Sequence, residues 1–180
     1  MATPLSVHAA APPLPPPQQH ALRQDQVCLV LYLKREWSEA SPNQNTVLDS
    51  GHREFGRTIV NDWAIYDSLP DVQDPSAFGT PIVARARGHH LQSGMQCSQW
   101  FLTCSIVFSN DSSYPGSTLA ITGMLQTNCK EGEWAIVGGT GKFTRAQGAI
   151  FYNKVKKMPG IGEILQLHMG VWYTPIDRST

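Results

Sequence analysis

The chain has 180 residues, enough for one domain with a sizeable hydrophobic core. Its 14 Lys and Arg residues balance its 14 Asp and Glu residues, so a zero formal net charge argues against a nucleic-acid partner or an anionic membrane surface. Every apolar run is too short for a membrane-spanning helix, so we expect no membrane partner either.

The first 26 residues differ in composition from the rest. Most of their apolar residues are isolated Ala and Pro, and residues 12–17 read Pro-Pro-Leu-Pro-Pro-Pro. A secretory signal needs a positive start and an unbroken apolar run, and neither is present. We therefore expect residues 1–26 to form a disordered Pro-rich tail, either a bland linker or a ligand for a proline-recognising partner, on a cytoplasmic protein.

Beyond the tail, the sequence is rich in strand-forming residues. Runs of Val, Ile, Thr, Tyr, Phe and Trp alternate with clusters of Gly, Pro, Asn, Asp and Ser, and no stretch has sustained helical periodicity. Eight short strands joined by hairpin-like loops indicate an antiparallel sandwich or a closed barrel. The expected strands are 27–33, 58–66, 81–91, 99–108, 117–125, 133–137, 146–154 and 163–174.

The third expected strand carries very small residues on one face. Alternation places Ala84, Ala86, Gly88 and His90 together on that face. Such a face suits close approach across a narrow barrel, which is the default, or leaves room for a ligand. Because His89 points to the opposite face from His90, the two histidines cannot bind one metal ion together.

The Gly-rich segment 138–142, Gly-Gly-Thr-Gly-Lys, is not a phosphate-binding loop. Such a loop needs a glycine five residues before the Gly-Lys pair and a Ser or Thr directly after it, but Ile136 and Phe143 stand there. Residues 146–155 that follow are strand formers rather than the start of a helix. The pattern predicts a hairpin corner, where glycines supply positive φ, and no nucleotide site.

Four cysteines, Cys28, Cys97, Cys104 and Cys129, show neither a CxxC pair nor metal-ligand spacing. We expect no metal and no cofactor. Without a secretion signal the thiols are expected to be free. Cys28 and Cys104 lie in apolar strands and are expected to be small core residues.

Five short segments of the chain follow one another in a recognisable order: Phe55-Gly, Val60-Asn-Asp, Val83-Ala-Arg-Ala-Arg-Gly, Gly116-Ser-Thr-Leu and Ile136-Val-Gly-Gly-Thr-Gly-Lys-Phe. In this set and order the chain resembles plant dirigent proteins. The resemblance covers roughly residues 27–175, with 176–180 as a C-terminal tail or the start of a linker. Residues 61–67, Asn-Asp-Trp-Ala-Ile-Tyr-Asp, more closely resemble the dirigent-like domain that is joined to a jacalin-related lectin domain in grasses.

The resemblance implies an eight-stranded antiparallel β-barrel with a central cavity. Dirigent proteins do not oxidise their substrates; they bind phenoxy radicals made by a separate oxidase and steer their coupling. Some relatives also use acidic residues to protonate a quinone methide. The grass chimeras lack signal peptides and are associated with defence. The resemblance to them therefore implies a cytoplasmic protein that can relocate to infection sites. It also implies a C-terminal lectin domain in a longer chain. Dirigent relatives are often trimers, so the resemblance is also compatible with a homo-oligomer.

The sequence departs from secreted dirigent proteins at polar positions. Lys34-Arg35 stands where they usually carry His-Asp, and Asp62 is the one acid kept where they carry two. A common aromatic pair is replaced by His89-His90, a frequent acid by Lys142 and a frequent arginine by Gln147. Lysine and arginine cannot replace a proton-donating carboxylic acid at neutral pH. The loss of these acidic residues favours a protein that binds a ligand over one that uses carboxylic acids to donate protons.

We interpret the barrel mouth and cavity as a carbohydrate site. Tryptophans such as Trp63 offer a flat apolar face, while carboxylates, amides and histidines can hydrogen-bond hydroxyl groups. The plainer alternatives stay open: a barrel aromatic is more often core, Asp62 can cap a turn, and the basic residues can be solvated on a rim. The candidate ligand-binding residues are Arg35, Asp62, Trp63, His90, Lys142 and Gln147.

The expected function is that of a non-enzymatic, carbohydrate-binding dirigent-like domain in plant defence. By family analogy its ligands are galactose-containing oligosaccharides or glycoconjugates. The alternative is a dirigent auxiliary protein that steers stereoselective phenoxy-radical coupling in lignan or phenolic biosynthesis.

Overall fold

The computed structural model describes residues 23–49, 55–70, 80–95, 99–126 and 128–175. The predicted tails therefore lie outside the described residues except for positions 23–26, and Cys97 lies outside them too. The first strand begins at Asp25, two residues before the expected start.

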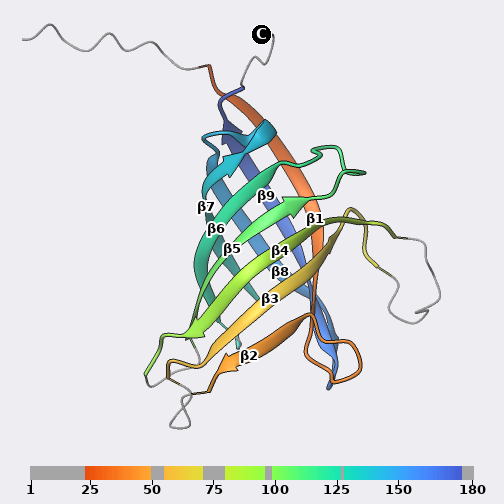
Figure 1. The fold of residues 1–180 in the computed structure, drawn as a ribbon, viewed down its shortest axis with the longest axis vertical. Helices are drawn as coiled ribbons and strands as arrows, with labels where there is room; N and C mark the ends of the chain where they lie inside the picture. Colours follow the sequence, from red (N-terminus) through yellow and green to blue (C-terminus); the bar gives the residue numbers. More distant parts are fainter. Residues whose placement is uncertain (1–22, 50–54, 71–79, 96–98, 127, 176–180) are drawn as a thin grey trace, which may run out of the picture.

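The described residues form nine β-strands and one short 3-10 turn, with no α-helix among them (Figure 1). Within this described part, no helix is long and apolar enough to cross a membrane. The elements are β1 (Asp25–Glu36), β2 (Gln44–Leu48), β3 (Thr58–Tyr66), β4 (Ile82–Gln92), β5 (Gln99–Phe108), β6 (Thr118–Gln126), β7 (Glu131–Thr140), η1 (Gly141–Phe143), β8 (Gln147–Met158) and β9 (Gly162–Tyr173).

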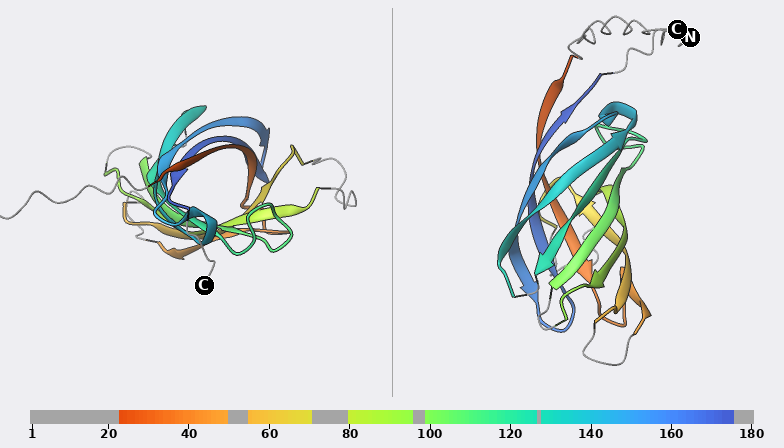
Figure 2. Two further views of the ribbon diagram at one scale, coloured as in Figure 1. Left: turned by 90° about the horizontal axis from the view of Figure 1, so that it is seen from above. Right: turned by 90° about the vertical axis from the view of Figure 1, so that its left-hand side faces the viewer.

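The strands form a closed antiparallel barrel, which confirms the predicted fold. Their order is β1-β9-β8-β7-β6-β5-β4-β3-β2, and an additional pairing between β1 and β3 closes the ring of eight strands. Figure 2 shows the strands surrounding a common axis when the molecule is seen from above. The ninth strand, β2, pairs with β3 beyond the point where β1 separates from it.

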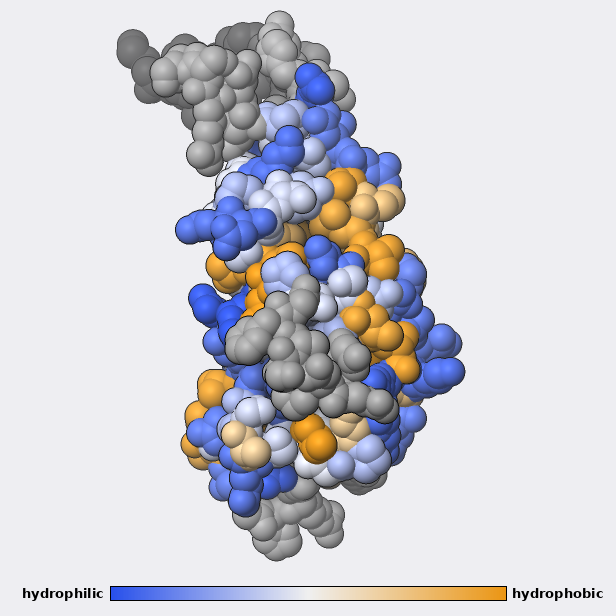
Figure 3. All heavy atoms as spheres, turned by 90° about the vertical axis from the view of Figure 1, so that its right-hand side faces the viewer, coloured by the Kyte–Doolittle hydropathy of each residue, from blue (hydrophilic) through white to orange (hydrophobic). Residues whose placement is uncertain are grey.

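Alternation along each strand supplies the core. In β9, every second residue from Glu163 to Tyr173 is buried, and all of these except Glu163 are hydrophobic. The outer surface also carries apolar side chains among polar ones (Figure 3). Exposed examples on the barrel strands are Val30, Phe151 and Trp172.

The two ends of the barrel differ. At the upper end in Figure 1, where β1 begins and β9 ends, four aromatic rings pack with centroids 4.9–5.7 Å apart. The turn η1 carries Phe143, which is fully buried, into this group. The lower end is the one where β1 ends and β9 begins. The four rings, here called the upper plug, are Phe108, Tyr114, Phe143 and Tyr173.

Three local predictions need correction. The strand β2 was not expected, because Pro42-Asn43-Gln44-Asn45 has the composition of a turn. Strand β8 continues through Lys156-Lys157, where the sequence suggested a loop, after a bulge between Lys154 and Lys156. Cys28 is exposed rather than part of the core, because it lies on the outward phase of β1. Cys104 is buried as expected, and burial raises the pKa of its thiol to about 12.

Candidate functional site

A buried ion pair lies at the lower end of the barrel. Arg35 near the end of β1 and Glu163 near the start of β9 are direct cross-strand partners. The Nη1 of Arg35 donates a hydrogen bond to Oε1 of Glu163 at 2.8 Å, and both residues are buried. Lys154 of β8 places its Nζ 3.6 Å from Oε2 of the same carboxylate. Two cations therefore hold one carboxylate inside the barrel.

Burial governs the electrostatics of Arg35. Removal from water lowers the pKa of its guanidinium, while the charge and hydrogen bond of Glu163 act in the opposite direction. A buried ion pair of this kind is costly to desolvate, so its partners depend on each other.

Aromatic rings form one wall beside this ion pair. The guanidinium carbon of Arg35 lies 4.9 Å from the centroid of the Trp63 ring, in a cation–π arrangement. The imidazole of His90 lies 5.4 Å from Trp63 and 5.3 Å from Trp100. Trp63 faces Ala86 across β3 and β4, so the small residues of β4 make room for its indole. The pairing with Trp63 thus accounts for the small side chain at Ala86.

His90 is held neutral by its surroundings. Burial, followed by the nearby positive charge of Arg35 and by His89, lowers the pKa of His90 to about 3. At neutral pH its ring is therefore an uncharged imidazole that can both donate and accept a hydrogen bond.

Three buried polar atoms around Trp63 have no hydrogen-bond partner among the described residues: Nε of Arg35, Oδ1 of Asn61 and Nδ1 of His90. Their residues are only 6%, 6% and 2% exposed. The amide nitrogen of Asn61 is satisfied, since it donates to the carbonyl oxygen of Ala86 at 2.9 Å. Buried polar atoms are normally paired, so this group can accept a polar ligand atom without breaking an existing bond. We call the lower cluster the set Arg35, Asn61, Trp63, His90, Trp100, Lys154 and Glu163.

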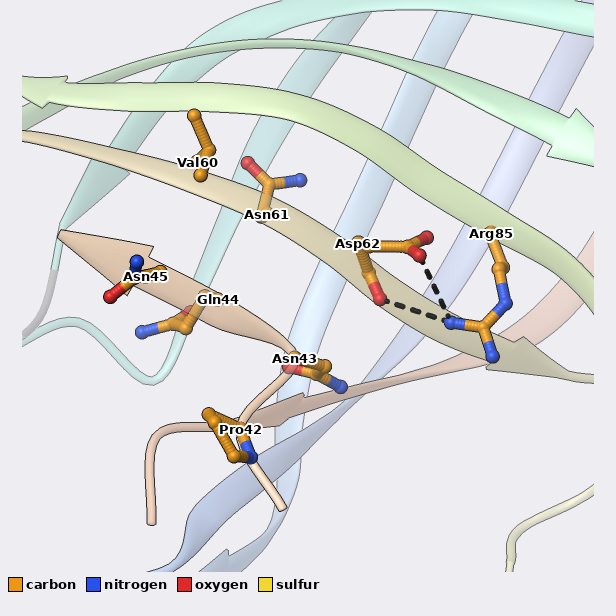
Figure 4. Close-up of a pocket in the computed structure, with 8 residues that line it drawn as sticks. All are labelled: Pro42, Asn43, Gln44, Asn45, Val60, Asn61, Asp62 and Arg85. Atoms are coloured by element: carbon orange, nitrogen blue, oxygen red, sulfur yellow. Dashed lines mark hydrogen bonds and ion pairs between the residues drawn. The ribbon is translucent and has the colours of Figure 1, made fainter. Parts of the chain in front are cut away.

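Asp62 lies on the other face of β3 from Trp63. Its carboxylate pairs with Arg87 at 3.0 Å and with Arg85 at 3.4 Å, and its side chain is half exposed. It borders an outer groove of about 610 Å³ between β2 and β3 (Figure 4). The groove is lined by Pro42, Asn43, Gln44, Asn45, Val60, Asn61, Asp62 and Arg85.

Lys142 and Gln147 lie at the upper end, away from the lower cluster. The Nζ of Lys142 is 5.4 Å from the ring centroid of Tyr173 in the upper plug, and its backbone N–H donates to Oγ of Ser117 at 3.0 Å. Gln147 is exposed and faces Trp172 across β8 and β9. Of the six predicted site residues, the structure brings together Arg35, Trp63 and His90 only. Within the described part of the chain, no group of His, Cys, Asp and Glu side chains is arranged to hold a metal ion.

Comparison with known proteins identifies the family. Residues 27–172 match the family model described as dirigent-like protein. The chain belongs to the dirigent family. Dirigent protein 1 of Arabidopsis thaliana is 28% identical over 120 residues, which cover 67% of this chain and 61% of that protein. The chain thus matches a little under two thirds of that relative's length, and the finer likeness to lectin-linked domains of grasses stays a prediction.

Solved structures with the same fold include other dirigent proteins. The pterocarpan synthase dirigent protein GePTS1 has a TM-score of 0.75 at 18% identity, covering 89% of this chain and 92% of that one. PsPTS1, with the same description, has a TM-score of 0.73 at 19% identity, covering 84% and 97%. A pyocyanin demethylase has a TM-score of 0.50 at 14% identity, covering 78% and 99%. At these identities the likeness shows the shared fold.

Glu163, the carboxylate of the lower cluster in this dirigent protein, is not among the predicted site residues. A signal was present, because Glu163 lies on the same strand face as Leu165 and Leu167 in the last expected strand. Position-by-position comparison with the acids of secreted dirigent proteins does not reveal an acid that enters the barrel interior from another strand.

Proposed function

We propose that this dirigent protein binds a phenolic aromatic molecule at the lower cluster and steers its coupling, as an auxiliary protein rather than an oxidant. Membership of the dirigent family and the fold shared with two pterocarpan synthase dirigent proteins support this role. The observation that carries the proposal is the convergence of three unpartnered buried polar atoms around the indole of Trp63.

The chemistry of the lower cluster matches a phenol. A phenolic hydroxyl both donates and accepts hydrogen bonds, so it can pair with Nε–H of Arg35, Oδ1 of Asn61 or Nδ1 of His90. Its ring finds aromatic partners in Trp63 and Trp100. The upper plug closes the other end, so a ligand enters from the lower end.

The proposed reaction needs no redox group in the protein. A separate one-electron oxidant removes one electron and one proton from each of two phenols, and the two radicals then join through one new bond. The protein contributes orientation, exposing one face of the radical to its partner. Glu163 is held by two cations, so we assign it a positioning role toward Arg35 rather than that of a proton donor.

A coupling assay tests this function. Coniferyl alcohol is oxidised by a one-electron oxidant with and without the protein, and the dimers are resolved by chiral chromatography. We expect an enantiomeric excess with the native protein, a reduced excess with His90→Phe, and an unchanged excess with Lys142→Gln, whose site lies at the upper end. Racemic dimers in the presence of the folded native protein would overturn the proposal.

A second candidate function is supported by the groove beside Asp62. The amide side chains of Asn43, Gln44 and Asn45, one carboxylate and one guanidinium line it, and planar polar groups of this kind suit sugar hydroxyls. The ligand class proposed for it, galactose-containing oligosaccharides, rests on the resemblance to lectin-linked dirigent domains. A cytoplasmic location, a defence role and a C-terminal lectin domain belong with this candidate.

A glycan array with calorimetric confirmation tests the groove. Asp62→Ala should weaken sugar binding by about 1–3 kcal/mol while the barrel stays folded. Binding that is unchanged in this variant removes Asp62 from the site. A silent array on folded native protein rejects the carbohydrate function.

A further inference from the structure

A basic pocket adjoins the lower cluster. It has a volume of about 250 Å³ and lies where the segment before β7 meets the lower parts of β8 and β9. The backbone N–H of Lys154 donates to the carbonyl oxygen of Lys130 at 2.8 Å, which ties that segment to β8. Among the described residues that line the pocket, four are lysines and Glu163 is the one acid: the lysines are Lys130, Lys154, Lys156 and Lys157.

Positive charge in this pocket exceeds negative charge. The carboxylate of Glu163 is already held by Arg35 at 2.8 Å and by Lys154 at 3.6 Å. Within the described part of the chain, no ion pair involves the other three lysines of the pocket. Five cations thus gather around one carboxylate, in a protein whose formal net charge is zero. Gathering like charges costs free energy, which a bound anion offsets.

The bulge in β8 contributes to this arrangement. The strand register shifts between Lys154 and Lys156, so Val155 is the extra residue, and Lys157 then faces Glu163 across the ladder. Bulges re-aim side chains and are frequent beside functional sites. Because of the extra residue, Lys154 and Lys157 stand opposite Leu165 and Glu163, which lie on one face of β9.

Two residues that line the pocket, Lys154 and Glu163, also belong to the lower cluster. Glu163 lines the pocket and also bonds Arg35, whose guanidinium lies over Trp63. A ring held by the lower cluster can therefore extend an anionic group toward the lysines. We propose that the ligand is a phenolic acid whose carboxylate binds in this basic pocket, in preference to the neutral alcohol. This inference rests on the proposed function and specifies the substrate class of its site.

Calorimetric titration with two matched probes tests the inference. Ferulate and coniferyl alcohol share one ring and differ in a terminal carboxylate against a hydroxymethyl group. We expect ferulate to bind about tenfold more tightly, as charge-assisted contacts imply. The double variant K156Q/K157Q should lose this preference while its affinity for coniferyl alcohol is unchanged. Lys142→Gln removes a positive charge at the upper end and should keep the preference.

The outcomes separate the two proposals. Equal affinity of the native protein for both probes overturns the phenolic-acid inference and leaves the proposed function standing. Binding of neither probe to folded native protein overturns both. A preference for ferulate that survives in K156Q/K157Q, with circular dichroism showing a folded barrel, removes the carboxylate from the basic pocket and overturns the inference as well.

Discussion

Arg35 and Glu163 are each removed from water and depend on their mutual ion pair. Removing one partner of a buried pair leaves an uncompensated charge. Glu163→Gln should therefore lower the free energy of unfolding by about 3–5 kcal/mol in urea denaturation, because Arg35 loses its charged partner. The double variant R35M/E163Q should lose less than the sum of its single changes.

The matched control for this prediction is Glu133→Gln, which alters an exposed acid of β7. It should change the stability by no more than about 0.5 kcal/mol. A loss below about 1 kcal/mol in Glu163→Gln would contradict the dependence of Arg35 on this carboxylate.

His90 links the stability of the barrel to pH. Its folded pKa of about 3 lies below the ordinary value of 6.5, so the unfolded chain binds a proton that the folded chain excludes. Its contribution to stability is intact above pH 6.5 and is lost at about 1.4 kcal/mol per pH unit as the pH falls toward 3. His90→Phe keeps a ring between Trp63 and Trp100 and abolishes this loss.

Urea denaturation of both proteins between pH 7 and pH 4 measures the effect. The stability of His90→Phe relative to the native protein should rise steadily below pH 6.5. His168→Asn, which changes an exposed histidine of β9, is the control and should follow the native curve. Parallel curves for native protein and His90→Phe would show that His90 is not held neutral.

Strand alternation explains which site residues could be foreseen. It places Trp63 and His90 on inward faces, and the structure brings them together with Arg35. The same alternation places Asp62 on the face opposite Trp63, so the sequence itself indicates that the two side chains do not share a site. The pairing of Arg35 with Glu163 could not be foreseen, because the register between β1 and β9 is set by tertiary contacts.

At the scale of elements, the turn η1 and the strand ends around it close the barrel. Phe143 is fully buried and contacts the other three rings of the upper plug. Phe143→Ala should cost about 3–5 kcal/mol in the free energy of unfolding, since it leaves a cavity that neighbouring rings fill only in part. Phe151→Ala is the matched control, because Phe151 is exposed on β8. Similar losses in the two variants would contradict the role of the upper plug.

The elements also show where composition misleads. The Gly-rich corner was predicted as a hairpin turn because it fails the phosphate-loop pattern, and the structure confirms it between β7 and β8. By contrast, the residues around the start of β2 have the composition of a turn, yet they form a strand. The side chain of Asn43 holds the approach to β2 by bonding the backbone of Lys34 and Glu36 at 2.9 and 2.8 Å, and pairing with β3 completes the strand. Tertiary pairing thus overrides local preference.

For the whole molecule, the fold is an eight-stranded barrel with the aromatic upper plug at one end and the lower cluster at the other. Its fold class follows from the strand periodicity of the sequence and agrees with dirigent structures that share less than a fifth of its residues. The pairing of β1 with β3 that closes the barrel could not be predicted from the sequence, because only three residue pairs form it. With the upper plug at the other end, we propose the lower cluster and its basic pocket as the ligand site.

The location of the ligand is the central claim, and tryptophan indole signals report on it. The chain has five tryptophans; Trp63 and Trp100 belong to the lower cluster, whereas Trp172 lies exposed near the upper end. Titration of ¹⁵N-labelled protein with coniferyl alcohol, with signals assigned by single Trp→Phe variants, should shift the indole N–H signals of Trp63 and Trp100 and leave that of Trp172 in place. A shift of Trp172 alone, or of none of the three at a saturating concentration, would contradict a phenol site at the lower end of the barrel.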